Sequence, residues 1–396
     1  MNRILSDRSR YVSGTQQCQY KRYYQYHFQG SGIVPKGQAL NLWTGTTIHK
    51  GLEQFYRLAQ ANGSAMPDRA VLRSAVAQAM QEMRELAFKD GFLEDPNKEY
   101  VLNEQMSLAE GLIWGYIRAV APKILEEHEI VCVEQEMPLD SGDVRLQTRI
   151  DLVLRSRANG QLQNVDFKSM SSLSDSTVEE FRTSPQMASC CMAAAAYLNE
   201  PVLSYSIHAL VKGGRGAFKK KGAQPTGKRQ YSPFCYLKYS PPCPPFTEAS
   251  LDLGGYWYDK QASWTLGELP GDPEASHMER LVELMPMETL WEQFAIIGPY
   301  EGSEFLGRQF MRSLAGEEKR WAETLEKAKG LEQPELDVLI SRSYQCHDYG
   351  SQCPFYDLCF QIDPGWQTPL ETGRYMRRVP HHEEELESFK EAGLVE

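Results

Sequence analysis

Hydrophobic and polar positions follow a helical period over the first third of the chain. In TGTTIHKGLEQFYRLAQ the apolar residues Ile48, Leu52, Phe55 and Ala59 recur every three or four positions, which is the spacing of one helix face. Residues 68–129 show the same period, with a break near DPNKEY and a second amphipathic stretch in SLAEGLIWGYIRAVAPKILEEH. The sequence therefore predicts that this part of the chain is mostly helical.

From about residue 130 the period changes to that of strands. IVCVEQEMPL, VRLQTRIDLVL and QLQNVDFKS are predicted strands, and the Asn-Gly pair in RANGQ predicts a hairpin between the last two. A helix follows, with Ser184 as N-cap and Pro185 at its first position, and then a strand in VLSYSIHALVK. This order predicts an α/β fold with a mixed central β-sheet flanked by helices.

The remaining segments complete the expected organisation. YSPFCYLKYSPPCPPF predicts an edge strand running into a proline-rich turn, and residues 250–335 are expected to be largely helical. We divide the chain into an N-terminal segment, a helical insertion, an α/β core, a helical region and a C-terminal cysteine segment with a charged tail (1–60, 61–130, 131–245, 246–340 and 341–396). No internal repeat and no Walker motif occur, so no ATP motor is expected within this sequence.

Composition adds limits to this picture. The 396 residues are 41% hydrophobic and 24% charged, as in a globular protein with two or three domain-sized units. The formal net charge of −11 argues against a generally cationic binding protein. We see no signal peptide and no apolar run long enough for a membrane helix, so we expect a cytoplasmic protein without a membrane partner. The nine cysteines are then expected to be reduced, with metal binding or burial as their roles.

The predicted hairpin carries candidate chemistry. Side chains two apart on a strand share a face, so pairing of the two strands brings Asp151 and Asp166 together beside Lys168. Two carboxylates and a main-chain carbonyl are hard oxygen ligands suited to Mg²⁺ or Mn²⁺. A lysine beside them can orient or help deprotonate an attacking water. Acids and lysines are also common on solvated strand faces, and that alternative stays open for the hairpin alone.

Flanking helices add further polar groups, and together these segments resemble a known family. His49 and Glu53 share a helix face, and Gln186 lies in the first turn of the helix after the hairpin. GTTIHKGLEQFY, RIDLVL, VDFKS and PQMASCC, in this order and spacing, resemble the RecB-like branch of the PD-(D/E)XK nucleases. The resemblance covers residues 11–60 and 131–212 well and the C-terminal cysteines more loosely.

The resemblance implies a role for each matching residue. It makes His49, Asp151 and Asp166 metal ligands together with the backbone carbonyl of Phe167, and it makes Lys168 the catalytic lysine. Gln186 would position the site or contact DNA, and Glu53 would play a supporting role. A buried core histidine is the alternative for His49. The chain departs from the family where Cys190 stands in place of the tyrosine of a Gln-x-x-x-Tyr helix, with Tyr197 on the same face as a candidate to compensate.

The cysteines near both ends of the sequence resemble those of AddB-type and CRISPR spacer-acquisition nucleases. In these proteins one N-terminal and three C-terminal cysteines bind a [4Fe–4S] cluster, which implies that role for Cys18, Cys346, Cys353 and Cys359. The Cys353–Cys359 spacing fits, whereas Cys346 lies further from Cys353 than is usual. Zinc bound by four thiolates, or no metal, are the alternatives. The other five cysteines are expected to be structural: Cys132, Cys190, Cys191, Cys235 and Cys243.

Two segments could contact nucleic acid. The loop 212–229 contains seven Lys or Arg and no acid, so it could neutralise phosphates, with a solvated surface loop as the alternative. Its DNA-binding candidates are Lys219, Lys220, Lys221, Lys228 and Arg229. In CQYKRYYQYHF the aromatic residues could stack on unpaired bases, but their spacing favours a core role.

We therefore expect a metal-dependent DNA nuclease that uses Mg²⁺ or Mn²⁺. The resemblance favours an exonuclease or end-processing enzyme of recombination, repair or phage DNA metabolism, acting on single-stranded DNA or duplex ends. Any helicase or recombination protein would be a separate partner. The alternatives are a non-catalytic DNA- or protein-binding module that keeps the fold, and a nuclease that acts on RNA.

Overall fold

The structure, a computed structural model, describes most of the chain. The described residues are 3–36, 40–95, 98–212, 271–285, 287–329, 331, 333–343, 346, 352–362 and 367–394. Several predictions fall outside them: the edge strand 231–246, Cys235 and Cys243, and the basic loop beyond Lys212 with Lys219, Lys220, Lys221, Lys228 and Arg229.

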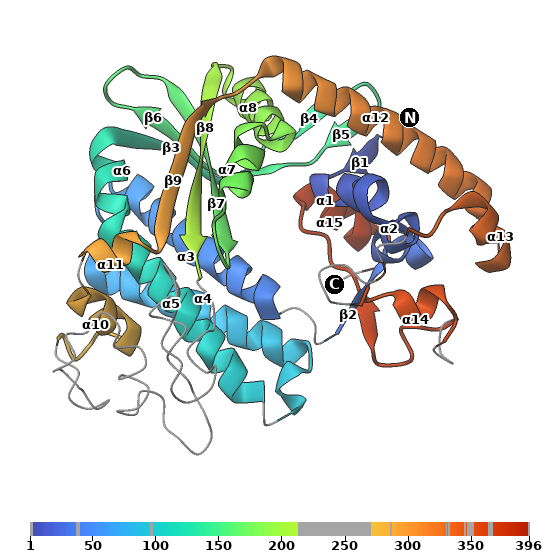
Figure 1. The fold of residues 1–396 in the computed structure, drawn as a ribbon, viewed down its shortest axis with the longest axis horizontal. Coiled ribbons are helices and arrows are strands. Elements are labelled where there is room, and N and C mark those ends of the chain that lie inside the picture. The colour runs from blue at the N-terminus through green and yellow to red at the C-terminus, as the bar shows by residue number, and fades with distance from the viewer. Residues whose placement is uncertain are drawn as a thin grey trace.

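A five-stranded mixed sheet forms the centre of the fold (Figure 1). Its strand order is β3-β6-β7-β8-β9, and only the β7–β8 pair is parallel. The crossover between these two strands contains α7 (Asp175–Arg182) and α8 (Pro185–Leu198). The expected mixed α/β fold is confirmed. The strand bounds are β3 His128–Glu136, β6 Arg149–Ser156, β7 Leu162–Met170, β8 Val202–Val211 and β9 Phe294–Glu301.

The hairpin and the following helix form where local signals predict them. Strands β6 and β7 pair from Leu152 opposite Val165 onward to a turn in which Gly160 has a φ of +73°. The Ser184 side chain accepts a hydrogen bond from the Met187 backbone N–H, which caps α8 just before Pro185. The turn joins the strands at one end of the hairpin, and the last residues of β7 lead to α7 and α8 from the other end.

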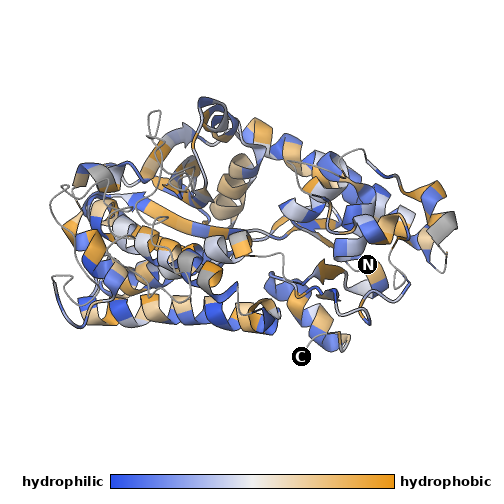
Figure 2. Cartoon of the chain, turned by 60° about the horizontal axis from the view of Figure 1, so that its bottom comes forward, coloured by the Kyte–Doolittle hydropathy of each residue, from blue (hydrophilic) through white to orange (hydrophobic). Residues whose placement is uncertain are grey.

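A different set of helices packs on each face of the central sheet. One apolar cluster joins Leu152, Val165 and Phe167 to α3, α4 and α5, whose bounds are Leu40–Ala61, Arg69–Lys89 and Glu99–Ala119. A second cluster joins Val153 and Ile207 to α8. Figure 2 shows apolar and polar residues alternating around the helices, as expected for helices with one buried face. No described helix combines the length and apolar character needed to cross a membrane.

One part of the expected helical region is a strand. Residues 250–335 were expected to be largely helical, but Phe294–Glu301 forms β9, which pairs antiparallel with β8. A short apolar run such as FAII has no clear period and fits either element. Helices do flank this strand within the described residues: α10 His277–Leu284, α11 Met287–Trp291 and α12 Glu304–Ala328.

The two ends of the chain pack together beside α12 (Figure 1). β1 (Ile4–Ser6) pairs with β5 (Val144–Leu146), which also pairs with β4 (Leu139–Ser141). β2 (Ile33–Pro35) pairs with β10 (Tyr375–Arg377). Tyr20 and Tyr24 of the aromatic segment are buried, so they act as core residues rather than as exposed stacking groups. The helices here are α1 Arg8–Val12, α2 Gln19–Tyr26, α13 Gln333–Leu339, α14 Tyr356–Cys359 and α15 Glu383–Glu391.

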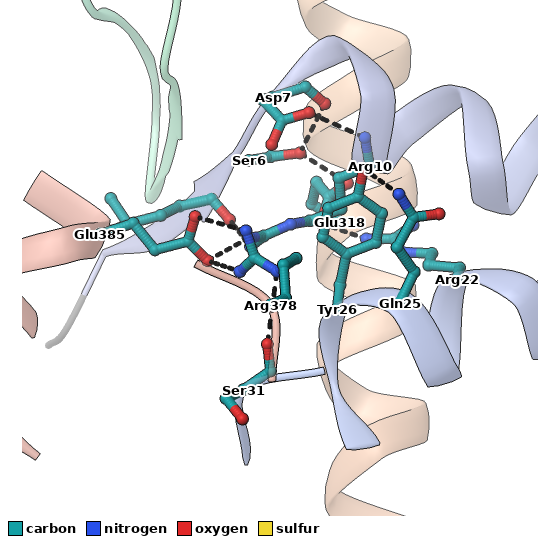
Figure 3. Close-up of polar contacts among 11 residues, drawn as sticks. Ser6, Asp7, Arg10, Arg22, Gln25, Tyr26, Ser31, Glu318, Arg378 and Glu385 are labelled. Atoms are coloured by element: carbon teal, nitrogen blue, oxygen red, sulfur yellow. Dashed lines mark hydrogen bonds and ion pairs between the residues drawn. The ribbon is translucent and has the colours of Figure 1, made fainter. Parts of the chain in front are cut away.

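Buried ion pairs join these terminal elements (Figure 3). Glu385 of α15 binds Arg10 of α1 and Arg378, with 2.5 Å between an Arg378 guanidinium nitrogen and the carboxylate. Arg22 of α2 binds Glu318 of α12 at 2.5 Å. All five side chains are at least nine-tenths buried, so each charge depends on its partner for the solvation that it loses.

Replacing Glu385 by Gln should destabilise the protein strongly. The change leaves two buried guanidinium groups without a counter-charge, and the free energy of unfolding should fall by about 3–5 kcal/mol. Urea denaturation measures this change. Glu384→Gln is the matched control, because Glu384 pairs with Arg145 at the surface and should change stability by less than about 1 kcal/mol.

The Glu385 carboxylate should make the stability of the protein depend on pH. Burial alone would raise the pKa of Glu385, but Arg10 and Arg378 outweigh it and lower this pKa. The stabilisation is therefore complete above the unfolded-state pKa of about 4.3 and is lost as the pH falls through the lower native pKa. Equal stability loss on acidification in wild type and Glu385→Gln would contradict this assignment.

Candidate active site

An open pocket of about 590 Å³ lies between α3 and the ends of β6 and β7. The two strands are antiparallel, so the first residues of β6 and the last residues of β7 meet at the same end of the sheet. A Cβ at Gly45 would lie 3.1 Å from the Ser169 hydroxyl, so glycine permits this close approach of α3 to β7. The pocket residues are Leu42, Gly45, Thr46, His49, Lys50, Glu53, Glu134, Arg149, Asp151, Phe167, Lys168, Ser169 and Lys212.

Asp151 occupies the centre of this pocket. Its carboxylate oxygen Oδ2 lies 3.5 Å from His49 Nδ1 and accepts a 2.8 Å hydrogen bond from the Phe167 backbone N–H. Burial raises the pKa of Asp151, and the nearby Asp166 adds to this effect. His49 thus faces a carboxylate in the pocket instead of being enclosed in the apolar core.

Glu134 is a site residue that the sequence analysis missed. Its Oε1 lies 4.0 Å from His49 Nδ1. One ligand atom from each of His49, Glu134 and Asp151 lies within 4.8 Å of the other two. Burial raises the pKa of Glu134 to about 8, with Asp151 and Glu53 adding to the shift. Two carboxylates that oppose each other's ionisation are a donor set that a divalent cation would neutralise.

The strand register was the signal that could have revealed Glu134. Val133 pairs with Leu152 and Gln135 pairs with Ile150, so Glu134 lies directly opposite Asp151. Glu134 also has a left-handed backbone, with φ of +45°, which is uncommon for a residue other than glycine. An acid across from the hairpin acid is therefore visible once β3 is paired with β6.

Asp166 and Lys168 form an ion pair next to this group. Lys168 Nζ lies 2.5 Å from Asp166 Oδ2, while the intervening Phe167 points into the core between α3 and α5. Burial works against the charge of Lys168, but Asp166 and Asp151 outweigh it and raise its pKa. The structure thus places all three predicted hairpin residues together, with Asp166 bound to Lys168 rather than within the His49 group.

The other predicted site residues lie at different distances from this centre. Glu53 lines the pocket and binds Lys50 at 3.0 Å and Arg57 at 2.8 Å. Burial alone would raise the pKa of Glu53, but these two cations outweigh the effect of burial and lower this pKa. Gln186 lines a separate pocket between α1, α8 and α12 instead of the His49 pocket.

Cys190 is buried one turn after Gln186. Its thiol lies 3.6 Å from the Thr148 hydroxyl, and burial raises its pKa to about 11. Tyr197, the candidate to compensate for the missing tyrosine, is 53% exposed further along α8. The helix therefore presents a neutral thiol, not a tyrosine hydroxyl, toward the hairpin.

The four predicted cluster cysteines come together. Cys18, Cys346, Cys353 and Cys359 all line one pocket of about 110 Å³, although Cys18 belongs to the opposite end of the sequence. Within the described residues, no three of their sulfurs lie within 4.8 Å of one another. A single zinc ion with Zn–S bonds of about 2.3 Å would hold its sulfurs about 3.8 Å apart. The four described sulfurs are therefore not gathered as a zinc ion would hold them.

Comparison with known proteins places the chain in a superfamily. Residues 12–360 match the family model of the PD-(D/E)XK nuclease superfamily, and the chain belongs to that superfamily. The match spans both the His49 helix and the Asp166-Phe167-Lys168 motif. None of the curated proteins compared with the chain matches it.

Replacing Glu134 by Gln should weaken Mn²⁺ binding. The neutral amide removes one charged donor from the group around His49, and the dissociation constant should rise about 10-fold or more, since even indirect contacts to a metal contribute this much. Titration calorimetry measures this constant. Glu129→Gln, an exposed position on the same strand, is the control and should bind Mn²⁺ as wild type does. Equal affinity in wild type and Glu134→Gln would remove Glu134 from the metal site.

Proposed function

We propose that the protein is a metal-dependent nuclease that hydrolyses phosphodiester bonds in DNA. The observation that carries this proposal is the group of His49, Glu134 and Asp151 beside the Asp166–Lys168 pair, in one pocket of a PD-(D/E)XK protein. Phosphodiester hydrolysis needs an activated water and cationic groups near the developing charge, and this pocket provides residues for both.

His49, Asp151, Asp166 and the Phe167 carbonyl would hold Mg²⁺ or Mn²⁺, with Glu134 as an additional ligand. The bound ion would supply a Lewis acid and lower the pKa of a water ligand. The Phe167 N–H holds the Asp151 carboxylate in place for this task.

Lys168 would act as a cation rather than as a base. Its ammonium group lies 2.5 Å from Asp166 Oδ2, beside the proposed metal ligands, and would donate hydrogen bonds to the attacking water or to a phosphate oxygen. Glu53 would support the site by holding Lys50 at the pocket edge.

The biological setting is part of the proposal. The resemblance of the four motifs to RecB-like nucleases supports an exonuclease or end-processing activity in recombination, repair or phage DNA metabolism, on single strands or duplex ends. A helicase or recombination protein would act as a separate partner. The DNA-binding candidates of the basic loop, Lys219, Lys220, Lys221, Lys228 and Arg229, lie outside the described residues and are part of the same hypothesis.

A [4Fe–4S] cluster is the second cofactor that we propose. The shared pocket of Cys18, Cys346, Cys353 and Cys359 supports it, because four thiolates are the usual ligand set of such a cluster. These residues would connect the two terminal segments and leave the catalytic pocket unchanged.

Cleavage assays test the nuclease proposal. End-labelled single- and double-stranded DNA should be cut in the presence of Mg²⁺ or Mn²⁺ and not in EDTA. Asp166→Asn and Lys168→Ala should each lower the rate about 100-fold or more, because the first removes a charged ligand of the metal and the second removes a cation beside the reacting phosphate. Lys123→Ala, an exposed lysine on α6 (Ala121–Glu127), is the control and should cleave normally.

The outcomes also separate the alternatives. Wild-type binding of DNA without cleavage would favour a non-catalytic module, and faster cutting of RNA in a competition assay would favour a ribonuclease. Persistent Mn²⁺-dependent cleavage by Asp166→Asn would contradict the assigned residue roles.

Iron analysis tests the cluster. Protein purified without oxygen should be brown and contain iron and sulfide, and Cys359→Ser should lose both, since a serine replaces one of four thiolate ligands. Cys132→Ser is the matched control, because Cys132 lies on β3 outside the cysteine pocket. A colourless wild-type protein that contains zinc, or no metal, would contradict the cluster.

A further inference from the structure

A second open pocket, of about 320 Å³, lies between α1, α8 and α12, and of the predicted site residues it contains Gln186. We call it the α12 pocket. Its volume suits one small unit of a ligand rather than a duplex. It is lined by Arg8, Tyr11, Val12, Gln16, Ser184, Pro185, Gln186, Leu306, Gln309, Phe310 and Ser313.

This pocket lies on the α8 side of the sheet, near the start of β6. Gln186 shares a face of α8 with Cys190, whose thiol lies 3.6 Å from the hydroxyl of Thr148, three residues before Asp151. Arg8 is held nearby because the Ser6 carbonyl accepts a 2.7 Å hydrogen bond from the Gln147 N–H, two residues before β6. His49 approaches the same strands from the α3 side, so the two pockets lie on opposite faces of the sheet.

The charge of the α12 pocket is positive. No acidic side chain lines it, although the whole chain has a net charge of −11. Arg8 is its ionised group, and within the described residues the exposed Arg8 guanidinium has neither an ion pair nor a hydrogen bond. On α12, Arg308 and Arg320 are paired with glutamates, whereas the exposed Arg312, two residues after Phe310, has no ion pair among the described residues and could add to the positive charge here. An unpaired guanidinium beside a nuclease site is available to bind a phosphate.

The pocket also contains an aromatic wall. The Tyr11 and Phe310 rings meet edge to face with centroids 5.5 Å apart, and the Tyr11 hydroxyl lies 2.8 Å from the Ser313 hydroxyl. These contacts fix the Tyr11 ring at the surface. A fixed aromatic ring beside a cation is the combination that single-strand-binding proteins use for one base and its phosphate.

We propose that the α12 pocket binds one nucleotide of a single DNA strand next to the scissile phosphate. Arg8 binds a phosphate of that strand, and the Tyr11–Phe310 pair contacts its unpaired base. A paired base could not reach the rings, so the pocket selects single-stranded segments or frayed ends. This inference rests on the proposed nuclease function and assigns residues that would hold the single strand.

Binding measured in EDTA tests the pocket separately from catalysis. The probe is a fluorescent 12-nucleotide oligothymidylate, compared by anisotropy with a blunt duplex. Arg8→Ala should reduce the slope of log K against log salt by about 0.7, the value for one lost phosphate contact on a single strand. Tyr11→Ala should weaken single-strand binding about 5-fold or more without changing the slope, and Tyr11→Phe should restore it.

A matched charge control and a kinetic readout complete the test. Arg8→Glu should weaken single-strand binding more than Arg8→Ala, whereas Arg157→Glu makes the same charge change beyond the far end of β6 and should have little effect. In cleavage assays Arg8→Ala should raise KM and leave kcat nearly unchanged, because the contact is made equally in the ground state and the transition state.

The results distinguish this inference from the nuclease proposal. If wild type cleaves DNA but Arg8→Glu and Tyr11→Ala bind the single strand as wild type does, the inference is overturned and the nuclease proposal stands. Equal losses for Arg8→Glu and Arg157→Glu, or for single strand and duplex, also overturn it. Selective loss of single-strand binding without any wild-type cleavage overturns the nuclease proposal and supports the strand-binding pocket.

Discussion

The candidate active site depends on one hydrogen bond, from the Phe167 backbone N–H to the Asp151 carboxylate. The regular backbone pairing of β6 and β7 ends where Leu152 faces Val165. Beyond this point the Phe167 N–H donates to the Asp151 side chain instead of to a backbone carbonyl. The strands therefore stay joined while their ends are open to the pocket. Since a register shift of one residue would turn Asp151 to the other face, this bond also fixes which face carries the acid.

The side chain of Phe167 packs in the apolar core. The Phe167 ring stacks on Tyr56 and meets Tyr116 and His208 edge to face. The Tyr116 hydroxyl lies 2.7 Å from His208 Nδ1, and burial lowers the pKa of His208 to about 3, so this histidine is neutral and can accept the bond. Because α3 carries both Tyr56 and His49, packing around Phe167 also sets the position of His49 over Asp151.

Local signals explain what the sequence could predict. The Asn-Gly turn and the Ser184 cap act within a few residues, so the hairpin, α8 and the proximity of Asp151, Asp166 and Lys168 followed from the sequence. Glu134 depends on how β3 pairs with β6 and on a left-handed backbone, neither of which a local pattern specifies. The strand β9 is stabilised by pairing with β8, a contact distant in sequence that overrides the helical expectation.

Helix α12 connects the proposed strand pocket with the cysteine pocket. Phe310 lines the α12 pocket, Glu318 binds the buried Arg22, and Trp321 packs in the cluster that contains Cys359. From Phe310 to Trp321 a helix rises about 16 Å, a short and stiff distance. Because Cys18 is the N-cap of α2 and Arg22 lies one turn further along it, a group bound by the cysteines would also hold α2 against α12. In the proposed complex the terminal segments would form one wall of the DNA pocket, and order at the cysteines would bear on how Arg8 and Tyr11 meet the strand.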